Sequence, residues 1–429
     1  MADEHHPPHE GVLSFGEPGE DIELYEGEAL LGGDAVGRVR IWLPMTRGLQ
    51  VKWRALDPPH GHLSLGRQTL TIEHPQLGTA ELPADVNHSD GWGASPEANL
   101  GTADDLVRVV VHWLNLPIIL PADVLANDAG AWAGRLEFDS CGWHFTMDSR
   151  PDHWEALQLA NRSDEQYLMT HVGEMRRVDG SSFDTATAAD ALFGWQAALS
   201  FALGRWVAPA VPVGFDGHGR RIWEQWAPWR CDTVRGYESW WDTHTGDDLA
   251  EFVAAYLRAY LDGTQHDEVR MAAMHVITAN HAGTTTEGKV MLAQAGLEYL
   301  AWVRLVLSGQ MSRKEYREKD AAARLRLLLQ EAQVDTTVPD ALPGLRELAC
   351  EHGFDGPSAT AWVRNRLVHP KDAGEPYRIE GLVWQTAQLL LEYGELLVLH
   401  GLGYKGRYMH RYPPHRWAHS SEYVPWASQ

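Results

Sequence analysis

Near its C-terminal end the chain carries two side chains whose types and spacing suit chemistry on a phosphodiester. Arg364 and His369 are separated by four residues, and the polar Asn365 directly follows the arginine. An imidazole gains and loses a proton near neutral pH, whereas a guanidinium is a permanent cation that matches phosphate oxygens. The three residues are therefore candidates for acid–base chemistry that needs no metal ion.

The position of Arg364 and His369 on their predicted helix supports a functional role more strongly than their spacing does. Arg270 and His275 have the same spacing, but they lie within an apolar helical run, which predicts a packed histidine. A helix over residues 358–368 is instead stopped by Pro370, so that the second histidine stands at a helix end. Five residues of straight helix rotate about 500°, which leaves the two side chains about 140° apart. Their convergence requires the helix to fray at the proline.

The sequence around the pair resembles a known ribonuclease family. Residues 362–371, Trp-Val-Arg-Asn-Arg-Leu-Val-His-Pro-Lys, are similar to the RN-x-x-x-H signature of HEPN ribonucleases. Residues 402–411, Leu-Gly-Tyr-Lys-Gly-Arg-Tyr-Met-His-Arg, follow a leucine-rich helix and resemble the C-terminus of bacterial HEPN proteins related to the ApeA anti-phage defence family. The resemblance covers about residues 266–412 and implies an all-α HEPN helical bundle there. The preceding regions resemble the N-terminal part of such proteins only loosely.

The resemblance implies a metal-independent mechanism with no cofactor. Neutral His369 would take the proton from a ribose 2′-hydroxyl, and Arg364 would stabilise the charge on the phosphorane oxygens. Asn365 would hold the histidine or the phosphate by hydrogen bonds. Attack by the 2′-oxygen leaves a 2′,3′-cyclic phosphate. In the family two such helices meet across a dimer, so a homodimer or higher homo-oligomer is expected to build the active groove.

Several basic residues near the motif are candidates for contacts with the RNA backbone, although exposed basic residues near a helix end are more often simply solvated. A non-catalytic alternative is that Arg364 pairs with an acidic neighbour and His369 caps its own helix. His410, His415 and His419 suggest no metal tail, because no carboxylate or cysteine pattern accompanies them. The RNA-binding candidates are Arg366, Lys371, Lys405, Arg407 and Arg411.

The C-terminal third is expected to be helical throughout, because apolar residues recur at helical spacing and the connections are short. Thr286 and Glu287 suit a helix start, and Gly309 suits a stop. The expected helices cover residues 286–307, 313–334, 343–352, 358–368 and 377–400.

The first two thirds predict an α+β architecture. Short alternating runs separated by Gly, Pro and Asp indicate strands between residues 22 and 147, interrupted by a helix over residues 103–116. The middle region predicts helices over residues 186–206 and 247–261 around a loop rich in tryptophan, for which burial is the favoured interpretation. The expected organisation is a disordered leader (1–19), a β-rich N-terminal domain (20–147), a mixed, Trp-rich middle region (148–265), the HEPN bundle (266–412) and a C-terminal tail (413–429).

Composition favours a soluble, cytoplasmic protein. The first twenty residues lack the basic start and apolar core of a signal peptide, and no stretch approaches the roughly 20 apolar residues of a membrane span. Cys141, Cys231 and Cys350 lie far apart, without a CxxC pair. The net charge of −23 would repel RNA, but residues 361–429 hold eight Lys or Arg against six Asp or Glu and leave −25 to the rest.

Two functions from different classes follow. The first is an endoribonuclease acting as a toxin-like effector in anti-phage defence by abortive infection, held inactive until its N-terminal regions sense a phage-derived or nucleotide trigger. The second is a non-catalytic scaffold or ligand-binding protein that dimerises through the bundle.

Overall fold

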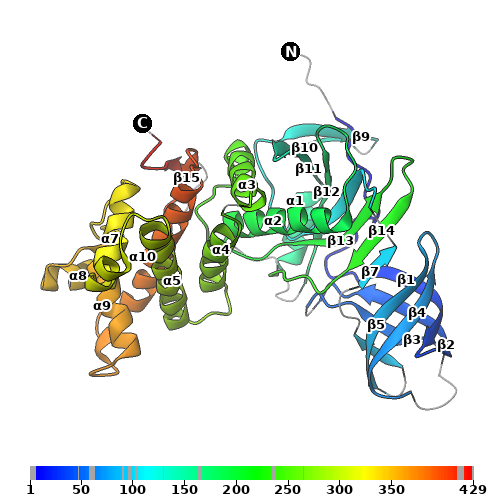
Figure 1. Ribbon diagram of the computed structural model, residues 1–429, viewed down its shortest axis with the longest axis horizontal. Coiled ribbons are helices and arrows are strands. Elements are labelled where there is room, and N and C mark those ends of the chain that lie inside the picture. Colours follow the sequence, from blue (N-terminus) through cyan, green and yellow to red (C-terminus); the bar gives the residue numbers. More distant parts are fainter. Residues whose placement is uncertain are drawn as a thin grey trace. The chain divides into compact units, whose positions relative to one another are not determined.

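The computed structural model describes residues 6–46, 48–57, 63–88, 91–94, 98–101, 104–128, 130–162, 166–233, 238–263, 265–412 and 420–427. It has the α+β class that the sequence predicts, with a β-rich N-terminal part and a helical C-terminal part. The chain divides into two compact units, residues 1–196 with 207–236 and residues 197–206 with 237–429 (Figure 1).

The first unit begins with a closed six-stranded barrel in the order β1-β2-β3-β6-β5-β4. Alternate residues point inward, so that Val39, Ile41, Trp53, Leu70 and Leu82 are fully buried. The strands are β1 (Ile22–Leu31), β2 (Asp34–Leu43), β3 (Lys52–Ala55), β4 (Gly66–His74), β5 (Gly78–His88) and β6 (Trp92–Ala94).

An eight-stranded antiparallel sheet completes the first unit, in the order β7-β14-β13-β8-β12-β11-β10-β9. Trp195 packs edge-on against Trp113 and Phe145 of the sheet, with ring centroids 4.9 and 4.8 Å away. The strands are β7 (Ala98–Gly101), β8 (Arg108–Leu114), β9 (Asp123–Asn127), β10 (Gly130–Ser140), β11 (Trp143–Ser149), β12 (Met169–Arg177), β13 (Ala208–Phe215) and β14 (Arg221–Trp226), and the helices are α1 (His153–Ala160) and α2 (Thr185–Leu203), which runs across the division between the units.

Strand β8 corrects the helix expected over residues 103–116. Its six residues from Val109 to Leu114 are all buried, because β8 lies in the middle of the sheet. A strand buried on both faces reads as a continuous apolar run without alternation, and the run of three valines favours extended backbone. The expected boundary at residue 147 also falls inside the sheet, since β11 pairs with β12 beyond it.

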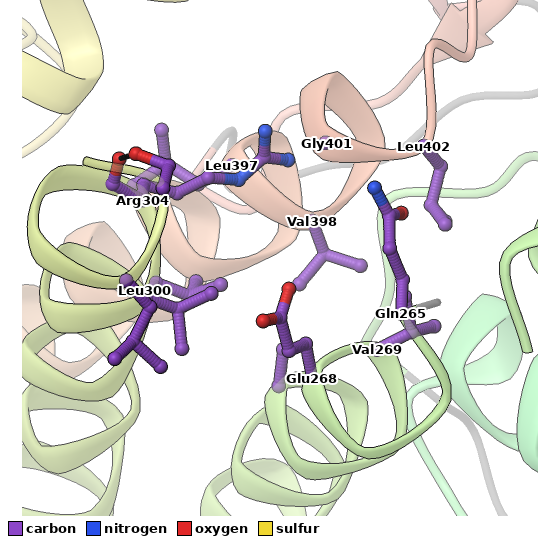
Figure 2. Close-up of a pocket in the computed structure, with 13 residues that line it drawn as sticks. Gln265, Glu268, Val269, Leu300, Arg304, Leu397, Val398, Gly401 and Leu402 are labelled. Atoms are coloured by element: carbon purple, nitrogen blue, oxygen red, sulfur yellow. Dashed lines mark hydrogen bonds between the residues drawn. The ribbon is translucent and has the colours of Figure 1, made fainter. Parts of the chain in front are cut away.

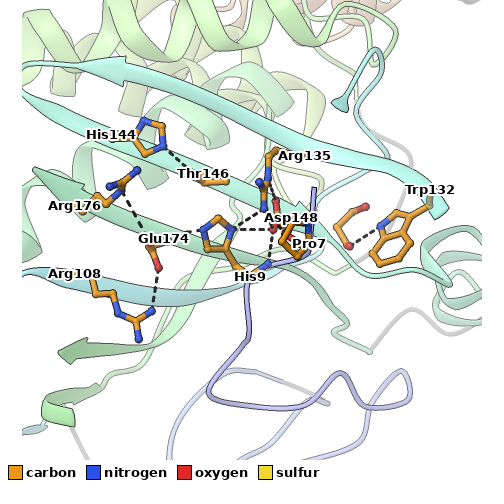
Figure 3. Close-up of polar contacts among 11 residues, drawn as sticks. Pro7, His9, Arg108, Trp132, Arg135, His144, Thr146, Asp148, Glu174 and Arg176 are labelled. Carbon is orange, nitrogen blue, oxygen red and sulfur yellow. Dashed lines mark hydrogen bonds and ion pairs between the residues drawn. The ribbon is translucent and has the colours of Figure 1, made fainter. Parts of the chain in front are cut away.

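Residues 6–13 of the expected disordered leader are held on the sheet (Figure 3). His6 bridges Leu125 in parallel, and the backbone N–H of Leu13 donates to His112 Nε2 at 3.1 Å. His9 donates from its backbone N–H and from Nδ1 to Asp148 Oδ2, at 2.7 and 2.9 Å. The leader prediction was wrong here, because these donors and acceptors lie more than 90 residues away in the sequence; residues 1–5 lie outside the described residues.

The second unit is mainly helical and confirms most predicted helix positions. One long helix was expected over residues 313–334. Ser312 caps its expected start, but Asp320 accepts a backbone hydrogen bond as the N-cap of a second helix and so divides it in two. The elements are α3 (Gly246–Leu261), α4 (His266–Asn280), α5 (Thr286–Ala301), the π-helix η1 (Trp302–Leu307), α6 (Arg313–Glu318), α7 (Ala321–Glu331), α8 (Pro343–His352), α9 (Gly356–Val368), the 3₁₀ turn η2 (Glu375–Tyr377), α10 (Leu382–Gly401), β15 (Arg407–Tyr408) and β16 (Glu422–Tyr423).

Helix α5 and η1 together have the predicted bounds, 286–307, and are long and apolar enough to cross a membrane, so the expectation that no stretch approaches a membrane span was wrong for this helix. Half of their most apolar window is buried, with Val290, Leu297 and Leu300 in the core. A core helix of a soluble bundle has this same composition, so the described residues do not indicate a membrane protein.

The predicted burial of the clustered tryptophans is confirmed. Trp223, Trp226, Trp240 and Trp241 are each 1% exposed, and Trp229 is partly buried. Their large apolar areas therefore contribute to the cores rather than to a stacking surface.

Asp148 joins the N-terminal segment to the sheet, so its replacement should destabilise the first unit in a pH-dependent way. Burial raises the pKa of Asp148, but Arg135 and His9 lower it further by hydrogen bonds, to about 2. A lowered pKa contributes stability above the ordinary value of about 4 that is lost as pH falls through about 2. We expect Asp148→Asn to cost about 2 kcal/mol at pH 5 and much less at pH 2, measured by urea unfolding.

Asp139→Asn is the matched control, because Asp139 is an exposed residue of β10 that pairs with His144. It should have little effect at either pH. A destabilisation by Asp148→Asn that is the same at pH 5 and pH 2 would contradict the assignment.

Candidate functional site

The N-terminal end of helix α9 is firmly anchored in the bundle. Asp355 caps the helix by accepting from the Ser358 backbone N–H at 3.0 Å and from Arg326 at 2.6 and 3.0 Å. A β-carbon at Gly356 would collide with the Tyr393 hydroxyl oxygen of α10, so only glycine allows this close approach. The helix therefore has a fixed position from which its other end projects.

The C-terminal end of α9 is as the sequence predicts, with Val368 the last helical residue. The His369 backbone has φ −126° and ψ 64°, outside the helical region, and its N–H donates to the Asn365 carbonyl at 2.8 Å. Pro370 cannot continue the helical hydrogen bonds. The imidazole of His369 is consequently released from the rotation of the helix, as convergence with Arg364 requires.

Of the three candidate catalytic residues, Arg364 and Asn365 are in contact, and His369 is the residue that ends the same helix. Arg364 Nη1 donates to Asn365 Oδ1 at 3.2 Å. Arg364 is partly buried, whereas Asn365 and His369 are exposed. Within the described part of the chain no acidic side chain forms an ion pair with Arg364 or His369, and the imidazole makes no capping bond. Of the non-catalytic alternative that the sequence left open, the acidic partner of Arg364 is therefore not observed there, whereas His369 is the C-cap residue of α9 through its backbone N–H.

Among the RNA-binding candidates, Arg366 and Lys371 lie nearest to this end of α9. Arg366 stands over the Trp362 ring at 4.7 Å and is 2.7 Å from Glu375 in η2. Lys371 is exposed. The Tyr377 hydroxyl that follows donates to Glu287 at the start of α5 at 2.8 Å, which fixes the loop beside the motif.

Lys405 and Arg407 are not brought to this place. They follow α10, whereas the end of α9 lies beside η2 and the start of α10 (Figure 1). The 20 residues of α10 rise about 30 Å. Lys405 is exposed and Arg407 stands over the Tyr423 ring at 5.2 Å, so both belong to the opposite end of the helix.

Arg411 corrects the prediction of an RNA contact, because its side chain is fully buried. Its Nη1 donates to Glu395 Oε1 at 2.6 Å, and its Nε donates to Gln388 at 3.2 Å. The other guanidinium nitrogen donates to Asn280 of α4. The cation thus joins α10 to α4 and is not accessible to a phosphate.

The residues on either side of Arg411 bind a second buried carboxylate of α10, that of Glu392. His410 Nδ1 and the Tyr412 hydroxyl donate to Glu392 Oε1 at 2.7 and 2.6 Å. Burial lowers the pKa of His410, but the hydrogen bonds and negative charges of Glu392 and Glu422 together outweigh burial and leave the pKa raised. Sequence reasoning missed this network, although two glutamates inside the apolar run of residues 389–399 are a signal that buried partners exist.

The helical unit also contains a cavity of about 180 Å³ between α4, the end of α5 with η1, and α10 (Figure 2). Its walls are mostly apolar, and Leu300, Leu397 and Val398 contribute to them. Polar groups approach from opposite sides, Glu268 from α4 and Arg304 from the π-helix. A π-helix often accompanies a functional position, and this one was not predictable from the residue pattern.

No group of three or more His, Cys, Asp or Glu side chains that could hold a metal ion occurs within the described residues. Both ring nitrogens of His410 contact carboxylates: Nδ1 is 2.7 Å from Glu392 Oε1 and Nε2 is 3.1 Å from Glu422 Oε1. His415 and His419 lie outside the described residues.

Comparison with known proteins relates the chain to the YopA proteins. Residues 101–237 match the model of the YopA central domain, and residues 263–423 match that of the YopA C-terminal domain. A relative from Bacillus subtilis (strain 168), described as SPbeta prophage-derived uncharacterized protein YopA, is 27% identical over 307 residues, which cover 70% of this chain and 67% of the relative. No solved structure matches the chain. The match to the YopA C-terminal domain contains the whole Arg364–His369 motif.

The buried position of Arg411 predicts a structural effect on substitution. Removing one partner of a buried ion pair usually costs 3 kcal/mol or more, whereas replacing both by apolar residues is often tolerated. We expect Arg411→Ala to lower the free energy of unfolding by about 3 kcal/mol. The double variant Arg411→Met, Glu395→Leu should regain much of the loss in the same urea titration.

Lys405→Ala serves as control, because the lysine is exposed, and should change stability by less than about 0.5 kcal/mol. If Arg411→Ala were as stable as Lys405→Ala, the buried network would be refuted and Arg411 would again be a candidate for RNA binding.

Proposed function

We propose that the chain is a metal-independent endoribonuclease of the HEPN type. The observation that carries the proposal is the exposed end of α9, where Arg364 and Asn365 are in contact and His369 leaves the helical conformation one turn later. A cation and a titratable base that face solvent without an acidic partner among the described residues are available to a phosphodiester.

In the proposed reaction His369 removes the proton of a ribose 2′-hydroxyl, and the 2′-oxygen attacks the adjacent phosphorus. The guanidinium of Arg364 stabilises the charge that grows on the phosphorane oxygens, while Asn365 positions the guanidinium by the bond that it already accepts. The bond from phosphorus to the 5′-oxygen then breaks, giving a 2′,3′-cyclic phosphate and a 5′-hydroxyl. The leaving oxygen takes a proton from an imidazolium, a role that the second His369 of a homodimer fills.

We further propose that the helices from α4 to α10 form the HEPN bundle and that two copies assemble through it. The motif resides on an anchored helix with an exposed end, which suits a groove shared between two subunits. Arg366 and Lys371 would contact the RNA near the motif, and Lys405 and Arg407 would contact it only if it extended along the length of α10. No cofactor or metal takes part.

The biological role that fits this activity is a toxin-like effector of anti-phage defence in the cytoplasm. A relative described as prophage-derived agrees with a role connected with phage, which we extend to this chain as part of the proposal. The β-rich first unit would then be the sensor or regulator that responds to a phage-derived or nucleotide trigger.

A second candidate, a non-catalytic scaffold, is favoured by the acidic residues around the motif. Glu375 forms an ion pair with Arg366, and Asp372 forms one with Arg378. Arg364 and Lys371 are therefore the cations of this end that have no ion pair within the described residues, which is few for an RNA groove.

Cleavage of a mixed RNA pool in EDTA distinguishes the two candidates. We expect the wild type to release 2′,3′-cyclic phosphate ends, and Arg364→Ala and His369→Ala to cut at least 100-fold more slowly, because each removes a group that acts in the transition state. The measurement is the initial rate together with chemical analysis of the product ends.

Arg317→Ala and His218→Ala are controls, since both residues are exposed and lie on α6 and on the turn before β14. Both should cut at the wild-type rate. Equal cleavage by all five proteins would refute the site. Absence of cleavage by the wild type, together with absence of growth inhibition on expression during phage challenge, would favour the scaffold.

A further inference from the structure

The barrel of the first unit has one outer face that is basic and aromatic. It is formed by β2, β3 and β6, which are adjacent in the order of the barrel. On these three strands the residues that alternate with the buried ones are mostly cations or tryptophans. They are Arg38, Arg40 and Trp42 on β2, Lys52 and Arg54 on β3, and Trp92 on β6.

The register of the strands sets these side chains in rows. Arg40 lies directly opposite Arg54, which in turn lies opposite Trp92. In the next row Trp42 lies opposite Lys52. Neighbouring strands are about 4.8 Å apart, so the row from Arg40 to Trp92 spans about 10 Å. Two cations and a flat ring are thus presented side by side.

Two arginines directly opposite each other on an exposed sheet face repel and destabilise the pair. Glu23 of β1 is 3.3 Å from Arg40 and offsets part of this repulsion, as Glu26 does for Arg38. Lys52 and Arg54 are exposed, and neither forms an ion pair within the described residues. An arrangement that is unfavourable in the isolated barrel becomes favourable once an anion lies between the cations.

The aromatic residues of this face are accessible from solvent. Trp92 is 47% exposed and is stacked on His88, with ring centroids 5.8 Å apart and planes at 10°. Trp42 is partly exposed under the Arg40 guanidinium, 5.3 Å from the ring centroid. An exposed indole ring that is held flat by a neighbour is a surface on which a base can stack.

The rest of the barrel does not share this character. The outer residues of β1 include Glu23, Glu26 and Glu28. On β4 the exposed Arg67 is neutralised by Asp85 of β5 at 3.0 Å. In a chain of net charge −23 the cations of the barrel are therefore concentrated on a single face.

We propose that the face made by β2, β3 and β6 binds single-stranded nucleic acid, with backbone phosphates at Lys52, Arg54 and Arg40 and a base stacked on Trp92. Separate cations follow a flexible backbone, and the ring needs an unpaired base, which a duplex does not offer. A protein partner would need an acidic segment and would make no use of the stacking surface. The site is independent of the proposed catalytic motif and would hold the strand whether or not that motif cuts it.

The test measures binding of fluorescein-labelled oligo(U), oligo(dT) and a mixed-sequence duplex by fluorescence anisotropy, in the His369→Ala background so that cleavage cannot interfere. Arg54→Thr should weaken oligo(U) binding several-fold and reduce the slope of log K against log salt by about 0.7, the share of one phosphate contact. Trp92→Ala should weaken binding roughly 10-fold with little change in that slope. Arg54→Thr should not lower the melting temperature, because it removes a repulsive pair.

Arg67→Thr is the matched control, an exposed arginine of the same barrel on β4, and should bind as the parent does. Equal binding of oligo(U) and oligo(dT), each tighter than the duplex, supports a site for single strands of either kind, and tighter binding of oligo(U) assigns it to RNA. Preference for the duplex, equal losses in Arg54→Thr and Arg67→Thr, or no binding by the parent would overturn the proposal. Because cleavage is not measured, failure of the ribonuclease proposal leaves this result unaffected.

Discussion

The helical unit depends on the neutralisation of two carboxylates inside α10. Glu392 and Glu395 are 3% and 1% exposed, and a buried carboxylate is costly unless it is paired and hydrogen-bonded. The donors come from the chain after the helix, where Arg411 meets one carboxylate and His410 and Tyr412 meet the other. Since the same arginine also donates to Asn280, the C-terminal segment, α4 and α10 are fixed together.

This constraint makes α10 a rigid support for the helix that carries the motif. Helix α9 comes close to α10 at Gly356, which faces Tyr393 near the middle of α10, and its capping residue Asp355 is held by Arg326 of α7. The anchored end thus carries the stabilising contacts, and the other end carries exposed polar groups. A site that must keep its side chains in position yet remain open to a polymer needs this division between the two ends of one helix.

Sequence reasoning succeeded where local signals determine structure and failed where distant partners do. Pro370 and the periodic apolar residues sufficed to place α8, α9 and most of α10, whereas the valine run of β8 is ambiguous because a central strand and a buried helix share the same pattern. Arg411 looks like any basic residue of a tail until its partners, more than a dozen residues away, are known. The basic face of the barrel appears only after the strand register sets Arg40 opposite Arg54.

The strongly negative charge of the chain bears on how it would meet a nucleic acid. Screening limits exposed charges to about 8 Å at physiological ionic strength, so a strand responds to the face it touches more than to the total of −23. Most cations discussed above form ion pairs with acidic side chains, as Arg366 does with Glu375 and Arg67 does with Asp85. Acidic surroundings then repel a strand everywhere except where cations lack such partners. For the proposed binding of nucleic acid, the excess of acid would therefore restrict contact to a few positions instead of preventing it, which would give selectivity without a basic protein.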